Sequence, residues 1–165
     1  MPSDQETFPR ILGVDPGLRG AITIMDGAGL TIIDVPVHSL ARGGKIKSEM
    51  DVYEFARWID AQARIDHAFI EKVASMPGQG VSSVFSFGKT FGQLIGVIAA
   101  NFIPMTLVPP QTWKKSLKVP AAKDGARARA SELMPAFAGF WNRVKDDGRA
   151  EATLLAYYGY KTWKK

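Results

Sequence analysis

The chain has 165 residues, and 21 lysines and arginines against 16 aspartates and glutamates give it a net charge of +5. It contains no cysteine and only two histidines, which excludes disulfides and thiol nucleophiles and disfavours a zinc site. The basic excess favours a polyanionic partner, and the chain lacks the run of about 20 apolar residues that would cross a membrane. We expect one cytoplasmic domain over residues 1–165, with a disordered lead-in at residues 1–9 and a basic tail at residues 161–165.

The first third of the chain predicts an antiparallel meander of three strands. The segments between its apolar runs are too short to hold a helix, so tight turns must join them. Residues 45–50 are polar and predict a loop, and the helical spacing of apolar residues from Val52 to Ala63 then predicts the first helix. The three predicted strands are residues 11–15, 20–25 and 30–37.

A second helix is predicted from about residue 82 to Asn101, with Ser82 or Ser83 as its cap. Three glycines recur every four residues along it. Their spacing predicts close packing of this helix on the sheet, with close approach of a DNA backbone as the alternative. These glycines are Gly88, Gly92 and Gly96. The remaining elements are short strands ending at Glu71 and at Val108, helices from Gln111 and over residues 123–134, and a last helix from Asp146 or Asp147 to about Tyr160.

Carboxylates stand at the ends of three predicted elements. Asp15 follows the first strand and Glu71 follows the fourth, while Asp147 and Glu151 are four residues apart and share one face of the last helix. A charge beside a buried strand costs free energy unless it is paired or bound to a metal. Two Mg²⁺ ions, bound by a few carboxylates and by substrate phosphates, hydrolyse a phosphodiester without histidine or cysteine. The pattern predicts a metal-dependent nuclease, although each acid alone has an ordinary structural explanation.

Five motifs occur in order along nearly the whole sequence. They are Ile11-Leu12-Gly13-Val14-Asp15-Pro16-Gly17, Phe69-Ile70-Glu71-Lys72-Val73, Met76-Pro77-Gly78-Gln79-Gly80 leading to Phe87-Gly88-Lys89, Val108-Pro109-Pro110-Gln111-Thr112-Trp113-Lys114, and Asp147-Gly148-Arg149-Ala150-Glu151-Ala152. This ordered set resembles the RuvC-type Holliday junction resolvases of the RNase H-like superfamily, most closely their phage and prophage branch. The resemblance implies an α/β fold with a mixed five-stranded sheet, whose first three strands are antiparallel, flanked by helices.

The resemblance also implies a homodimer in the cytoplasm of a bacterial cell, encoded by the cell or by a phage. Such a dimer cuts two strands of a four-way DNA junction and uses two Mg²⁺ ions per active site. Mn²⁺ can serve in place of Mg²⁺. Asp15 would bridge both metals, Glu71 would hold one, and the last helix would supply the other ligands. The family usually has two acids three residues apart on this helix, whereas Asp147 and Glu151 are four apart. We retain this pair, with Asp146 as the alternative to Asp147.

Other residues are expected to contact the DNA. Lys123 matches a lysine of the family that would contact the scissile phosphate. The family's aromatic wedge is replaced by Ala74-Ser75-Met76, so the wedge is absent or has moved to Met76 or Phe85. Trp113 is expected to lie in the core, with stacking on a base as the alternative. The remaining DNA-binding candidates are Gln79, Ser82, Ser83, Lys89, Lys114, Lys115, Lys118, Arg127, Arg129 and Arg149, the last of which would either contact phosphate or balance the two helix acids.

Two other functions fit the same residues. Carboxylates recognise phosphodiesters and not branch shape, so the substrate would then be a flap, another branched DNA or an RNA–DNA hybrid. A non-catalytic junction-binding module is the second alternative, and the intact acids argue against it. The superfamily also includes ATPases, but this chain has no second glycine-rich phosphate loop. We expect no small-molecule substrate and no membrane partner.

Overall fold

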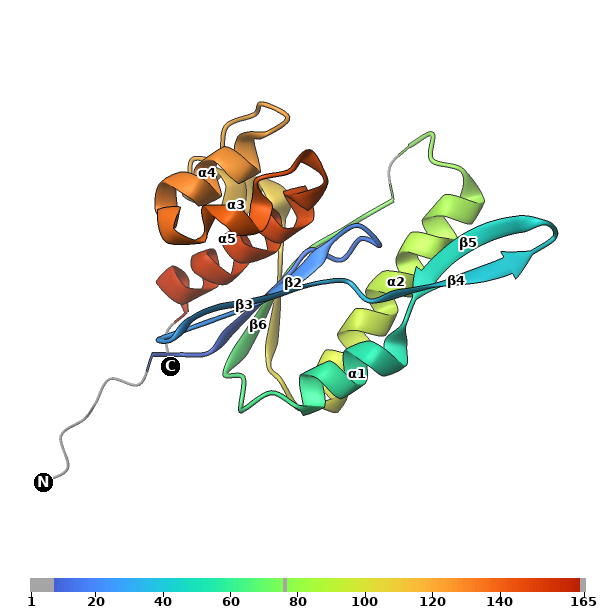
Figure 1. Ribbon diagram of the computed structural model, residues 1–165, viewed down its shortest axis with the longest axis horizontal. Helices are drawn as coiled ribbons and strands as arrows, with labels where there is room; N and C mark the ends of the chain where they lie inside the picture. Colours follow the sequence, from blue (N-terminus) through green and yellow to red (C-terminus); the bar gives the residue numbers. More distant parts are fainter. Residues whose placement is uncertain (1–7, 76, 164–165) are drawn as a thin grey trace, which may run out of the picture.

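The computed structural model describes residues 8–75 and 77–163, which form a five-stranded mixed sheet with helices on both faces (Figure 1). The strand order is β3-β2-β1-β6-β7. The first three strands pair antiparallel, and β6 pairs parallel with both β1 and β7. The predicted sheet is therefore confirmed. Its strands are β1 (Ile11–Val14), β2 (Ala21–Asp26), β3 (Gly29–Asp34), β6 (His67–Glu71) and β7 (Met105–Val108).

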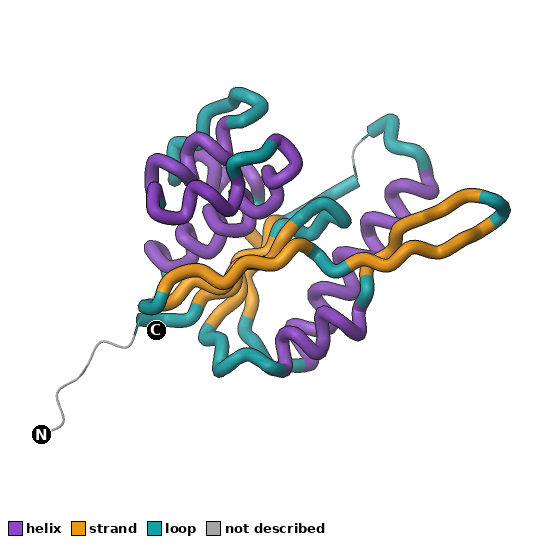
Figure 2. The backbone as a smooth tube through the Cα atoms, viewed as in Figure 1, coloured by secondary structure: helices purple, strands orange, loops and turns teal. Residues whose placement is uncertain are grey.

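Helices cover the two faces of the sheet as separate layers (Figure 2). The helices are α1 (Val52–Asp60), α2 (Val81–Ala100), α3 (Pro110–Ser116), α4 (Gly125–Leu133) and α5 (Asp147–Thr162), with short 3-10 segments η1 (Pro135–Trp141) and η2 (Val144–Asp146) before α5. One apolar cluster joins the sheet to α1 and α2 through Phe55 and Leu94, and a second joins it to α3 and α5 through Trp113 and Leu154. Because β1 is buried on both faces, its sequence is a continuous apolar run.

A β-hairpin follows the sheet where the sequence predicted a loop. Residues 45–50 form β5 (Lys45–Met50), which pairs antiparallel with β4 (Val37–Arg42). The predicted strand 30–37 is accordingly split, because Pro36 lacks the N–H that would continue the ladder. Gly43 and Gly44 form the connection with φ values of +56° and +74°, the left-handed region that a two-residue hairpin turn requires.

Helix α2 differs from its prediction in its cap and in its packing. It begins at Val81 after Gly80, which has no side chain to cap it, so Ser82 and Ser83 are not the cap. A Cβ added to any of the three glycines would meet no atom within 4 Å, so the predicted packing of their face on the sheet is wrong. The opposite face, with Leu94 and Ile98, enters the core.

The glycine face of α2 is consequently an apolar surface that the described part of this chain leaves uncovered. With 20 residues and a mean hydropathy of 1.2, α2 is long and apolar enough to cross a membrane by length and composition alone. Its buried stripe of Thr90, Leu94 and Ile98 packs instead on the sheet.

Several predicted features fall at the edges of the described residues. Most of the expected lead-in, residues 1–7, lies outside them, as do Met76 and the last two lysines of the expected basic tail. Phe8, which belongs to the expected lead-in, stacks on Tyr160 with ring centroids 6.2 Å apart. Lys161 and Thr162 extend α5 and are not part of a separate tail.

Candidate active site

Asp15 and Glu71 emerge side by side because they end two adjacent parallel strands. Val14 of β1 is in register with Ile70 of β6, and each acid is the next residue along. After Asp15 the chain turns back within five residues, with the N–H of Gly20 donating to the carbonyl oxygen of Gly17 at 2.9 Å. The turn leads directly into β2, so Asp15 stays at the edge of the sheet.

Helix α5 brings a third carboxylate, Glu151, to the same edge. It crosses β1 closely because position 13 is glycine, where a Cβ would collide with the carbonyl oxygen of Ala152. Burial, followed by the negative charges of Glu151 and Glu71, raises the pKa of Asp15 to about 7. Burial and Glu151 also raise the pKa of Glu71. These three acids form one group of mutually repelling charges, which we call the acidic cluster.

Two neighbouring residues of α3 bind the acidic cluster. The indole Nε1 of Trp113 donates to Oε2 of Glu71 at 2.9 Å, and Nζ of Lys114 donates to Oε1 of Glu151 at 2.8 Å. Although burial opposes it, the hydrogen bond and negative charge of Glu151 raise the pKa of Lys114. Trp113 is 0% exposed, so it is a core residue that orients Glu71, and stacking on a base is excluded.

Asp147 lies at the rim of the acidic cluster. Its Oδ1 accepts a hydrogen bond from Nε of Arg127 at 2.6 Å. Together with Glu151 and the exposed Lys123 it lines a cavity of about 390 Å³. Asp147 therefore lies at the same cavity as Glu151, where it is paired with Arg127.

Asp146 faces away from the acidic cluster. It is 4% exposed, and its two oxygens accept hydrogen bonds of 2.9 and 2.8 Å from the guanidinium group of Arg143. Arg149 donates to both oxygens of Asp34 at 2.7 Å, so the expectation that it balances the two helix acids is wrong. Asp146 and Arg149 thus form ion pairs near the start of α5, with Arg143 and with Asp34, and neither pairs with the cluster.

Gly148 explains the spacing of the helix acids. A Cβ at this position would lie 2.6 Å from the carbonyl oxygen of Arg19 and 3.1 Å from Oδ2 of Asp15. The position three residues before Glu151 therefore faces Asp15, but the backbone of the β1–β2 turn fills the space that a side chain would need. The acid stands at position 147 instead.

Comparisons with known proteins identify the fold. No family model and no curated protein matches the sequence. The structure matches T. thermophilus RuvC in complex with a Holliday junction substrate, with a TM-score of 0.60, 11% identity and coverage of 93% of this chain and 95% of that one. The chain has the fold of the RuvC-type resolvases. A second T. thermophilus RuvC structure matches with a TM-score of 0.52 and 13% identity over 92% of this chain and 96% of that one. The yeast mitochondrial Holliday junction resolvase Ydc2 matches with a TM-score of 0.58 and 12% identity over 94% of this chain and 79% of that one.

Within this RuvC fold, several predicted DNA-binding cations are engaged in contacts inside the chain. Lys89 binds Glu49 at 2.6 Å, and Arg129 binds the carbonyl oxygen of Leu117 and the carboxylate of Glu132. Lys114, Arg127 and Arg149 hold the acids described above. The exposed candidates are Gln79, Lys115, Lys118, Lys123 and the two serines Ser82 and Ser83 at the start of α2. Phe85, the described wedge candidate, is 74% exposed on α2.

The sequence did not reveal how Trp113 and Lys114 act on the acidic cluster. Both follow β7, whose Val108 is in register with Glu71 of β6, so parallel pairing places the start of α3 beside the cluster. Knowing that β6 and β7 are adjacent in the sheet would have placed Trp113 and Lys114 beside the acidic cluster. The apolar runs in the sequence do not establish that these two strands are neighbours.

The donor set of the RuvC-fold site suits a hard cation. Across residues 8–75 and 77–163, no three acidic or histidine side chains converge closely enough to hold a metal as they stand. Two members of the cluster are instead turned toward Trp113 and Lys114. The ligands available are carboxylate oxygens, which Mg²⁺ and Mn²⁺ prefer. Three partly buried carboxylates with one neighbouring lysine also leave a negative charge for a cation to neutralise.

Proposed function

We propose that this protein is a metal-dependent endonuclease that cleaves phosphodiester bonds in four-way DNA junctions. The acidic cluster carries this proposal, because it occupies the ends of the two central strands of a fold shared with Holliday junction resolvases. One of those resolvases was solved with a Holliday junction substrate. We place the protein in the bacterial cytoplasm, whose reducing conditions suit a chain without cysteine.

The chain's own residues divide the work at this site. Asp15, Glu71 and Glu151, with Asp147 at the rim, would hold two Mg²⁺ ions, and Mn²⁺ would substitute for them. The metal supplies an activated water and stabilises the leaving oxygen. Trp113 fixes the position of Glu71 by donating a hydrogen bond to its Oε2. Lys123, across the cavity from Glu151, would neutralise charge that develops on the scissile phosphate.

A comparison of substrates tests this proposal. We expect cleavage of a four-way junction in Mg²⁺ at opposed strands, leaving 5′-phosphate and 3′-hydroxyl ends, with Ca²⁺ supporting binding but not turnover. A flap, a linear duplex and an RNA–DNA hybrid of matched sequence are the comparison substrates, and cut positions are mapped on sequencing gels. If the flap or the hybrid were cleaved faster than the junction, that substrate and not the junction would be the preferred one. Junction binding without cleavage of any substrate would identify a non-catalytic binding module.

We also propose that the protein acts as a homodimer through the glycine face of α2. Symmetric cleavage of two opposed strands needs two active sites, and each chain provides one. The row of Gly88, Gly92 and Gly96 carries no side chains, so the same face of a second copy can approach its backbone closely. The exposed Phe85 continues this face toward the start of the helix and would be covered by the partner copy.

Replacing Gly92 with glutamate is expected to abolish dimerisation without unfolding the chain. A Cβ there would meet no atom within 4 Å, and the glutamate would place a charge between two helices. Light scattering should show the mass falling from about twice 18.0 kDa to 18.0 kDa. Gly139→Glu is the matched control, because position 139 is equally open and lies in η1. A wild-type protein that is monomeric both free and on a junction would contradict the dimer.

A further inference from the structure

The β4–β5 hairpin projects from the sheet as a separate arm (Figure 1). Its strands pair over their full length, from Val37 opposite Met50 to the glycine turn. At the base, Met50 is buried in the core, and Glu49 accepts a hydrogen bond from Lys89 of α2 at 2.6 Å. The arm is therefore held firmly at one end and extends into solvent at the other.

The arm presents positive charge that the described part of the chain does not neutralise. Lys45 and Lys47 are exposed and form no ion pair within residues 8–75 and 77–163. They are two residues apart, so they lie on the same face of the strand. Ile46 between them is 79% exposed. The hairpin's single acidic residue, Glu49, is already bound by Lys89.

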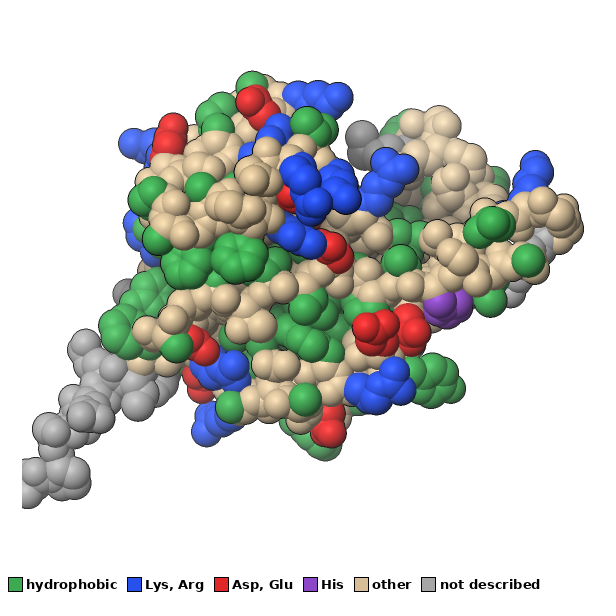
Figure 3. Space-filling view, in the orientation of Figure 1, with side chains coloured by type: hydrophobic (Ala, Val, Ile, Leu, Met, Phe, Trp, Pro, Cys, Tyr) green, Lys and Arg blue, Asp and Glu red, His purple; other side chains and the backbone are tan. Residues whose placement is uncertain are grey.

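A groove lies between this arm, the β1–β2 turn and the start of α2. It measures about 810 Å³ and is lined on one side by Lys47 and Ser48 and on the other by Arg19 and by Ser82 and Ser83 of α2. Arg19 belongs to the turn that follows Asp15, so the groove and the acidic cluster share this turn. The space-filling view shows the molecule hollowed between the hairpin side and the helical side (Figure 3).

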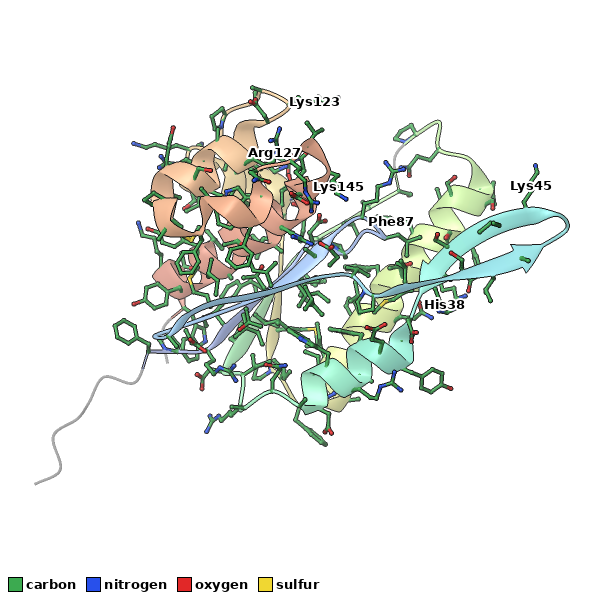
Figure 4. The ribbon with its side chains drawn as sticks, viewed as in Figure 1. His38, Lys45, Phe87, Lys123, Arg127 and Lys145 are labelled. Carbon is green, nitrogen blue, oxygen red and sulfur yellow. The ribbon has the colours of Figure 1, made fainter. Side chains whose placement is uncertain are left out.

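Cations lie on the helical side of this hollow and at the tip of the hairpin. Figure 4 shows Lys45 on the hairpin, and Lys123, Arg127 and Lys145 on the opposite, helical side. Phe87 of α2 lies between the two groups. A polyanion that reached the acidic cluster would therefore pass the cations of the helical side, and the hairpin carries further positive charge away from the body of the domain.

We propose that the β4–β5 hairpin binds the duplex of one junction arm, with Lys45 and Lys47 on its phosphates. The inference rests on the proposed function in one respect, that branched DNA is the ligand. A two-stranded ribbon fits the major groove, which is about 12 Å wide. Six residues at about 3.4 Å each extend the hairpin by about 20 Å, which matches about six base pairs of duplex. The hairpin thus contacts DNA away from the branch point, where the acidic cluster acts.

The test is the double variant Lys45→Ala, Lys47→Ala in the full chain, measured in Ca²⁺ with Asp15→Asn also present so that no cleavage intervenes. We expect the Kd for a four-way junction with long arms to rise about 10- to 100-fold at about 0.1 M salt, and the slope of log Kd against log salt to fall by about 1 to 2. Arg64→Ala, Lys161→Ala is the control with the same loss of charge. Arg64 is 90% exposed in the α1–β6 connection and Lys161 lies at the far end of α5, so this pair should change Kd less than threefold.

Hydroxyl-radical footprinting then locates the contact. The parent protein should protect the branch point and a second patch about six base pairs along one arm, and the lysine double variant should lose only the second patch. Unchanged Kd and salt dependence, or loss of protection at the branch point alone, would overturn the hairpin proposal. If wild-type protein cuts no substrate yet shows the lysine-dependent arm footprint, the nuclease function fails and the hairpin proposal stands.

Discussion

Replacing Asp15 with asparagine is expected to reduce junction cleavage about 10³-fold or more, while junction binding is kept or becomes tighter. Burial raises the pKa of Asp15, and the negative charges of Glu151 and Glu71 raise it further, so Asp15 carries the charge that a bound cation would stabilise most. The amide removes an anionic metal ligand, which blocks turnover, and it also removes a negative charge from the path of the phosphate. Cleavage in Mg²⁺ and binding in Ca²⁺, measured on the same junction, separate the two effects.

Asp26→Asn provides the matched control for this change. Asp26 also ends a strand, at the opposite edge of the sheet, where it binds Nε of Arg10 at 2.9 Å. Its amide variant should keep cleavage within about twofold, since no cluster residue contacts it. If Asp15→Asn lost junction binding and thermal stability in parallel with cleavage, Asp15 would be a structural residue and the proposed metal site would be wrong.

Adding a single methyl group at Gly148 should have the second-largest effect. The alanine Cβ would lie 2.6 Å from the carbonyl oxygen of Arg19 and 2.8 Å from Cα of Gly20, which are backbone atoms that cannot rotate away. Helix α5 must therefore move off the β1–β2 turn and carry Glu151 with it. A displacement of about 1 Å costs about 10²-fold in rate, and overpacking of about 1–3 kcal/mol lowers the melting temperature by about 5 °C.

Steady-state cleavage and thermal melting of Gly148→Ala measure these losses. Gly139→Ala is the control, because a Cβ there meets no atom within 4 Å. Gly148→Asp is the informative companion, since it restores an acid three residues before Glu151. We expect it to be as impaired as Gly148→Ala, because the backbone clash outweighs the added ligand. Wild-type activity in Gly148→Asp would show that the turn adapts and that the four-residue spacing has no steric cause.

The sheet and the two central acids were predictable because central strands leave a simple signal. Strands β1 and β6 are buried on both faces, so each reads as an apolar run that an acid terminates. The pairing of Asp15 with Glu71 followed from the same pattern. The same pattern could not decide between Asp146 and Asp147. Adjacent helix residues point about 100° apart, so an error of one residue in the helix start changes which acid faces the site. The turn before α5 directs Asp146 toward Arg143 and Asp147 toward Arg127.

The hairpin and the glycine face of α2 were mispredicted for a common reason. Sequence patterns identify a strand or a helix contact through burial, and both features lie in solvent. Strand β5 has polar residues on both faces, so its sequence resembles a loop. The local indication of a hairpin was the Gly43-Gly44 pair, which forms the turn. The glycine spacing along α2 indicated that something approaches closely, but it carried no information on whether the partner is the sheet, DNA or a second copy.

The attachment of the hairpin has a further consequence for how the protein meets its ligand. The acids of the cluster lie on strands and a helix that pack directly on one another, so they keep their relative positions unless the whole domain opens. The hairpin joins the sheet through Val35 and Pro36, leads into α1 through Asp51, and is held at its base by the buried Met50 and by Lys89. A tilt of the hairpin beyond this base would leave Asp15 and Glu71 in place, because neither residue lies on the hairpin. Recognition of variably angled duplexes is thereby separated from the fixed geometry that hydrolysis demands.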